Sequence, residues 1–135
     1  MYTHADVNTP FYIDLSWWET KERNLGRFLA EILGEPEASD LGDEPIDYID
    51  TTTAEVHQLD ALWARVLTEK AHRPDYITPT TPLTNAVLRA LIENLNRPMT
   101  VTQMHRRINR GSPDSLLRMM KTARIHYGIV PVDET

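Results

Sequence analysis

The sequence of 135 residues contains no cysteine. Disulfide bonds, thiolate zinc sites and thiol nucleophiles are therefore excluded. A chain of this length can bury a sizeable apolar core, so it needs neither a disulfide nor a metal ion to hold its fold. The lack of cysteine fits a cytoplasmic protein better than a small secreted one, and we expect a cytoplasmic location.

Long apolar runs are missing as well. No segment approaches the roughly 20 residues that a membrane-spanning helix requires. Residues 1–10 have neither the basic start nor the apolar stretch of a signal peptide, so we expect neither a leader nor a membrane partner. Hydrophobic residues make up 41% of the chain and charged residues 25%, a balance typical of a globular protein.

The residues that usually carry catalysis do not form recognisable motifs. The five glycines are isolated, which excludes a glycine-rich phosphate loop, and no GxSxG or HExxH motif occurs. Glu55, His57 and Asp60 lie close enough in sequence to contact a metal ion, but a histidine beside surface carboxylates is rarely a metal site. We expect no catalytic residues, no metal, no cofactor and no enzymatic activity.

Positive charge is absent from residues 29–63 and concentrated late in the chain. Residues 1–60 hold three Lys and Arg against fourteen Asp and Glu, a balance of −11. Residues 97–124 hold seven against one, a balance of +6, although the formal net charge of the whole chain is −6. The chain is therefore electrically polarised, which the overall net charge conceals.

Apolar periodicity and turn residues predict the elements of residues 1–75. They are, in order, a strand over 11–15, a helix from Asp14 or Ser16 to Leu33, an acidic loop, a short hairpin around Thr51–Ala54 and a helix from Glu55 or Asp60 to Ala71. The acidic stretch Glu31–Asp50 has two interpretations: a solvated loop, or a counter-charge that lies across the basic surface and competes with DNA.

Capping signals locate three helices in residues 76–135. Thr100 followed by Gln103 is a capping box, and a hydroxyl residue precedes proline at Thr81-Pro82 and at Ser112-Pro113. The patterns predict helices from Thr81-Pro82 to Leu95, from Thr100 to Arg110 and from Ser112 to Gly128, and then a strand over 129–132. Pro131 confines that strand to the edge of a sheet.

A short helix joined by a tight glycine-containing turn to a second helix is the helix-turn-helix pattern. Preceded by a third helix and followed by a strand, residues 81–133 resemble the winged helix-turn-helix superfamily. The resemblance implies a core of three helices and a wing that begins at the last strand. A complete wing would need a further strand from the N-terminal part or from another subunit.

We therefore expect a mainly α fold with a minor α+β component. Residues 1–75 would form an acidic, helical N-terminal part with short strands. Residues 76–135 would form the winged-helix-like helix-turn-helix unit, unless the whole chain is one compact domain. Tryptophan at helical spacing is typical of core or subunit contacts, so we expect Trp17, Trp18 and Trp63 to pack there rather than to bind a ligand.

The last helix presents a polar face if its apolar residues point inward. Leu116, Met120 and Ala123 share one side at 3.6 residues per turn. The opposite side suits the major groove of DNA, because Arg donates two hydrogen bonds to guanine and all the polar side chains bind phosphates. The candidate DNA-binding residues are Arg106, Arg107, Arg110, Ser115, Arg118, Lys121 and Thr122.

The sequence thus predicts a small, transcription-associated protein that binds double-stranded DNA. A homodimer would offer two helices to half-sites about one helical turn apart. The alternative is a non-enzymatic protein-interaction or dimerisation module that keeps the winged-helix shape without binding nucleic acid, because a fold does not fix a function. A sensor with a small-molecule pocket near the tryptophans is a third, weaker hypothesis.

Overall fold

The computed structural model describes residues 5–20, 25–35, 45–50 and 52–132. Across these residues the chain forms six helices and two small antiparallel sheets. The fold is therefore mixed α+β, whereas a mainly α fold was expected. The chain divides into two compact units. Residues 24–76 form the middle unit, and residues 1–23 join residues 77–135 in the terminal unit. The boundary expected after residue 75 lies beside Tyr76, but the N-terminal segment belongs with the C-terminal part.

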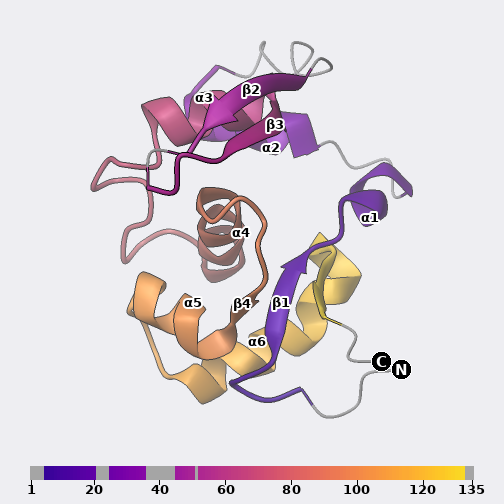
Figure 1. Cartoon of the computed structure of the whole chain (residues 1–135). Coiled ribbons are helices and arrows are strands. Elements are labelled where there is room, and N and C mark those ends of the chain that lie inside the picture. Colours follow the sequence, from indigo (N-terminus) through magenta and orange to yellow (C-terminus); the bar gives the residue numbers. More distant parts are fainter. Residues whose placement is uncertain (1–4, 21–24, 36–44, 51, 133–135) are drawn as a thin grey trace. The chain divides into compact units, whose positions relative to one another are not determined.

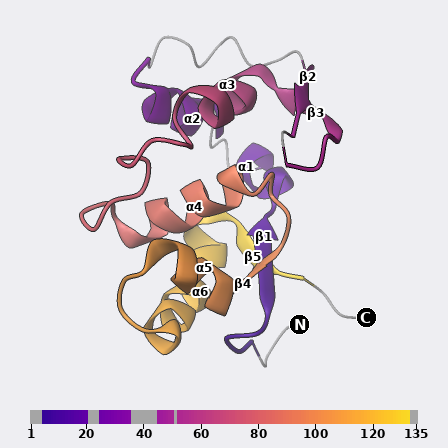
Figure 2. The same cartoon turned by 60° about the vertical axis from the view of Figure 1, so that its left-hand side comes forward.

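The terminal unit combines a three-stranded sheet with helices that lie between its strands in sequence (Figure 1). The strand order is β4-β1-β5, and α4, α5 and α6 contact one another (Figure 2). Its elements are β1 (Pro10–Ile13), α1 (Leu15–Thr20), α4 (Leu83–Glu93), β4 (Met99–Thr100), α5 (Val101–Ile108), α6 (Pro113–Tyr127) and β5 (Ile129–Pro131).

Strand β1 occupies the centre of this sheet. Phe11 lies opposite both Met99 of β4 and Pro131 of β5, so the first strand of the chain pairs on both sides with the last third. Side chains alternate along the strand, and Phe11 and Ile13 are buried. Burying each of these side chains contributes about 1.5–3 kcal/mol. The expected strand is confirmed at residues 10–13, and β5 is an edge strand, as Pro131 indicated.

Polar contacts attach the N-terminal segment to the elements around α4 and α5. The side chain of Asn96 donates to the carbonyl of Ile13 at 2.9 Å and accepts from its N–H at 2.7 Å. The carbonyl of Val7 accepts from both the N–H and the hydroxyl of Thr102, at 3.0 and 3.1 Å. One backbone donor that the first turn of α5 would otherwise leave unpaired is thus satisfied.

The start of α4 differs from the expected cap. Pro82 is the capping residue and no side chain caps the helix. The hydroxyl of Thr81 accepts instead from the N–H of Thr78 at 2.9 Å, within the preceding turn. Among the apolar residues of this helix, Val87 and Leu91 are fully buried.

The middle unit contains α2 (Leu25–Leu33), β2 (Pro45–Ile49), β3 (Val56–Asp60) and α3 (Ala61–Glu69). The two strands form the expected hairpin, and Asp60 starts α3 by accepting from the N–H groups of Leu62 and Trp63. The single helix expected up to Leu33 is wrong, because the structure has α1 and α2 in different units. Helical spacing is a local signal and cannot show that two apolar faces join different cores.

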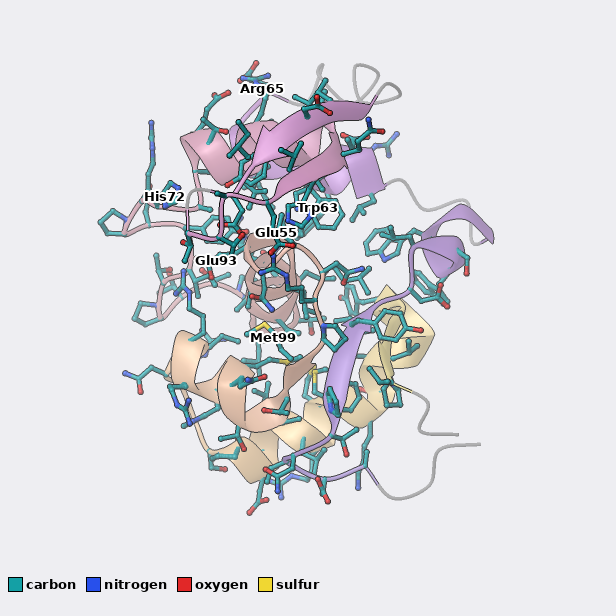
Figure 3. The ribbon with its side chains drawn as sticks, viewed as in Figure 1. Glu55, Trp63, Arg65, His72, Glu93 and Met99 are labelled. Carbon is teal, nitrogen blue, oxygen red and sulfur yellow. The ribbon has the colours of Figure 1, made fainter. Side chains whose placement is uncertain are left out.

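Arg65 of α3, labelled with Trp63 in Figure 3, makes two ion pairs within the middle unit. It lies 2.6 Å from Glu35 and 2.7 Å from Glu69. The guanidinium lowers the pKa of the Glu69 carboxyl through its hydrogen bond, and the two carboxylates raise the pKa of Arg65. All these side chains are about one-third exposed or more, so the pairs add little stability. Among the described residues no helix has the length and apolarity to cross a bilayer.

Replacing Asn96 by glycine tests the attachment of β1. The residue has φ +57°, which glycine adopts without strain, so the loss comes from the two hydrogen bonds to Ile13. We expect Asn96→Gly to lower the free energy of unfolding by about 1–3 kcal/mol in urea titrations. Asn109→Gly is the matched control, since Asn109 has φ +55° and an exposed side chain. An equal loss of stability at the two positions would show that the hydrogen bonds from Asn96 to Ile13 do not hold β1 in place.

Replacing Gly128 by alanine tests the junction of α6 and β5. Gly128 has φ +62°, and an added Cβ would lie 2.8 Å from Cε3 of Trp17. Gly34→Ala is the control, because Gly34 has φ +74° but no atom within 4 Å of that position. Both substitutions introduce backbone strain, and the collision should make Gly128→Ala more destabilising by about 1–3 kcal/mol. Urea unfolding measures the difference, which should disappear if Trp17 can move aside freely.

Candidate nucleic-acid interface

Helices α5 and α6 are joined by a turn of four residues, 109–112. Asn109 and Gly111 both adopt left-handed backbone conformations there, with φ +55° and +69°. The expected capping box at the start of α5 is confirmed, because the N–H of Gln103 donates to the hydroxyl of Thr100 and the Gln103 side chain accepts from the N–H of Thr100. Val101 and Met104 bury the inner side of α5.

A second capping box begins α6. The hydroxyl of Ser112 accepts from the N–H of Ser115 at 3.1 Å, and the hydroxyl of Ser115 accepts from the N–H of Ser112 at 3.0 Å. Ser115 also donates to the carbonyl of Ser112 at 2.9 Å. The start expected at Ser112-Pro113 is therefore confirmed, and the Ser115 hydroxyl serves the helix terminus in this structure.

Helix α6 has one buried face and one exposed face. Leu116, Met120 and Ala123 are at most 2% exposed, as expected. Tyr127, the last residue of the helix, is 37% exposed and does not extend that buried face. The exposed residues on the other side are Asp114, Arg118, Lys121 and Thr122. The Thr122 hydroxyl donates to the carbonyl of Met119, one turn back along the helix.

Two of the candidate arginines brace the terminal unit. Arg107 donates from Nε and Nη2 to the carboxylate of Glu93 on α4, at 2.7 and 2.9 Å (Glu93 is labelled in Figure 3). Arg110 donates from Nη1 to the carbonyl of Pro79 at 2.6 Å. Both partners lie in the terminal unit, so the acidic stretch Glu31–Asp50 does not supply them. Residues 36–44 of that stretch lie outside the described residues.

The remaining three cations are exposed. In the part of the chain that the structure describes, Arg106, Arg118 and Lys121 make no hydrogen bond or ion pair. They project from two consecutive helices whose opposite faces are buried. Such side chains can approach the phosphates of a nucleic acid without first breaking an internal contact.

The two units differ in the sign of their charge balance. The middle unit, residues 24–76, has four Lys and Arg against twelve Asp and Glu, a balance of −8. The terminal unit has ten against eight, a balance of +2. The sequence therefore carries its excess of cations in the same unit as α5 and α6.

The other candidate groups form no site in the described residues. Trp18 and Trp63 are buried, and half-buried Trp17 meets Trp18 edge-on with ring centroids 5.5 Å apart. The carboxylate of Asp60 caps α3, and no three potential metal ligands come together within the described ranges. The sequence interpretation missed the roles of two acids: Glu93, which pairs with Arg107, and Asp114, which shares the exposed face of α6. The position of Asp114 on the exposed face could have been inferred from its spacing of four residues from Arg118, which places the two on one side of a helix.

The contribution of the Ser115 hydroxyl to the capping box of α6 can be measured as a change in stability, independently of any binding to DNA. Ser112→Ala and Ser115→Ala should each lower the free energy of unfolding by about 0.5–2 kcal/mol, because each leaves a helix N–H without its partner. The double variant should lose less than the sum, since the two residues act as one unit. Thr122→Ala on the exposed face is the control and should stay within about 0.5 kcal/mol of the parent. Urea titration measures all four; a Ser115→Ala value within that same range would show that the cap contributes nothing.

Comparison with known proteins adds no relative from which a role could be transferred: no protein family, no curated protein and no solved structure is detectably similar to this chain. Its function therefore has to be argued from the arrangement of its own residues.

Proposed function

We propose that the protein is a small, cytoplasmic, transcription-associated DNA-binding protein whose terminal unit is a winged-helix-like helix-turn-helix. One observation carries this proposal: Arg118, Lys121 and Thr122 are exposed on α6, whose opposite face is buried, and exposed Arg106 lies on the helix before it. In this proposal α6 is the recognition helix and enters the major groove, which is about 12 Å wide and admits a helix.

The sheet supports the winged-helix assignment. β5 follows α6 directly, and β1 from the N-terminal part pairs with it. The sequence left open whether such a strand would come from the same chain or from another subunit, and we assign this place to β1 because it pairs with β5. β4 precedes α5 and borders β1 on the other side. A helix-turn-helix with such a sheet beside it is the arrangement expected of a winged-helix-like unit, and this supports the assignment.

The number of cations that are free to contact phosphates determines the expected salt dependence of DNA binding. Five phosphate contacts would give a slope of about −4 to −5 for the logarithm of affinity against the logarithm of salt concentration. Arg107 and Arg110 already have partners, which leaves Arg106, Arg118 and Lys121. On a duplex of random sequence, where no base is selected, all three can contact phosphates, and three such contacts correspond to a slope of about −3.

The proposed partners are double-stranded DNA and a second copy of the chain. A two-fold dimer would present two α6 helices to half-sites separated by one helical turn, about 34–36 Å. A palindromic target site follows from that symmetry.

An alternative is a protein-interaction module of the same shape that does not bind nucleic acid. The Arg107–Glu93 pair favours it, because a glutamate neutralises one of the central cations of α5. In addition, the terminal unit has a charge balance of only +2, which gives a weak field for a DNA-binding surface.

Fluorescence anisotropy of a labelled duplex of random sequence, measured over a salt series, distinguishes the two functions. The parent protein should bind at low salt with a slope of about −3, and Arg118→Gln/Lys121→Gln should reduce the slope by about 1.8. Lys70→Gln/Arg73→Gln in the middle unit removes the same charge and should leave the slope unchanged. Absence of binding at low salt would reject the DNA-binding function and favour the interaction module.

A further inference from the structure

Asp114 is the one acid on the exposed face of α6 within the described part of the chain. It is exposed and makes no hydrogen bond or ion pair there, although Arg118 follows it by one turn. At 100° per residue, Asp114, Arg118 and Lys121 fall within an arc of about 60°. A carboxylate in the first turn of the helix thus points the same way as the cations proposed to meet DNA.

A carboxylate at this place weakens contact with the DNA backbone. It repels phosphates, so a face that held DNA only by charge would bind better without it. An ionised carboxylate also accepts hydrogen bonds and donates none. Asp114 therefore needs a donor from the DNA if α6 approaches closely.

The base edges of the major groove supply such donors selectively. Cytosine presents its N4 amino group, and aspartate is suited to accept from it, whereas guanine presents N7 and O6 and thymine presents O4, all acceptors. Adenine has an amino group beside an acceptor, which suits an amide better than a carboxylate. A carboxylate placed against an acceptor is left desolvated and unpaired.

We propose that Asp114 determines base specificity by selecting cytosine at one position of the target, while Arg118 selects guanine nearby. This inference rests on the proposed DNA-binding function. The first turn of a recognition helix reaches the base edges most directly, and Asp114 is in that turn. Four residues of helix rise about 6 Å, which spans roughly two base-pair steps of 3.4 Å.

The same residue also has a structural interpretation, because an acid near a helix N-terminus is stabilised by the helix dipole. That role predicts a change in stability for Asp114→Asn and no change in the preferred base. Base preference is thus the readout that separates the two roles.

Selection of duplexes from a library with a randomised segment, followed by sequencing, tests the inference on the full chain. The parent should enrich cytosine at one position, by about tenfold over the other bases, and guanine one or two steps away. Asp114→Asn should change the preferred base from cytosine to adenine, because an amide pairs with both N6 and N7. Asp114→Ala should lose preference at that position only. Both variants should bind random duplex at low salt more tightly than the parent.

The control is Asp47→Asn on β2, which removes the same charge from an exposed residue of the middle unit. It should leave the selected sequence as it is in the parent. An unchanged cytosine position in both Asp114 variants, or selection without any preferred base, overturns the inference while leaving DNA binding intact. Absence of any duplex binding by the parent at low salt overturns the proposed function, and the inference with it.

Discussion

The terminal unit depends on how the first strand is held between two strands from the end of the chain. Asn96 holds both polar backbone groups of Ile13, and β4 and β5 pair with β1 on its two sides. These bonds connect residues more than eighty positions apart. Bringing such distant residues together costs conformational entropy, and the contacts that form must compensate for that cost. Phe11 and Ile13 are buried, and this burial offsets part of that cost.

This constraint also determines what α6 exposes. The helix begins at a capping box, ends at Gly128 beside Trp17, and buries one face among α4, α5 and β5. Its orientation within the unit is therefore fixed at both ends. The cations divide accordingly: Arg107 and Arg110 hold neighbouring elements together, whereas Arg118 and Lys121 face solvent. The structure thus separates cations that support the fold from cations that can meet a partner.

Local signals in the sequence were sufficient where the physics is local. The caps at Thr100 and Ser112 and the inner face of α6 follow from interactions over three or four residues, and the structure reproduces them. Distant partners were not predictable in the same way. Nothing near Arg107 in sequence indicates Glu93 fourteen residues away, and no local pattern shows that residues 1–23 complete a C-terminal unit. Periodicity also merged α1 and α2, since it cannot assign two apolar faces to two cores.

If the protein binds DNA as proposed, the net charge of the chain favours selection of particular sites over tight, indiscriminate binding. At −6 the protein as a whole is repelled by a polyanion, and this repulsion is screened beyond about 8 Å at physiological ionic strength. In the proposed function, the exposed cations of α5 and α6 would act at short range. There the base that faces Asp114 would determine whether its carboxylate gains a hydrogen-bond donor or only loses water. In that proposal, each base pair read correctly would be worth about 1–3 kcal/mol. If α6 meets DNA as proposed, a weakly attracting surface with one carboxylate in the first turn of the helix would be better suited to discriminating among sites than to coating DNA.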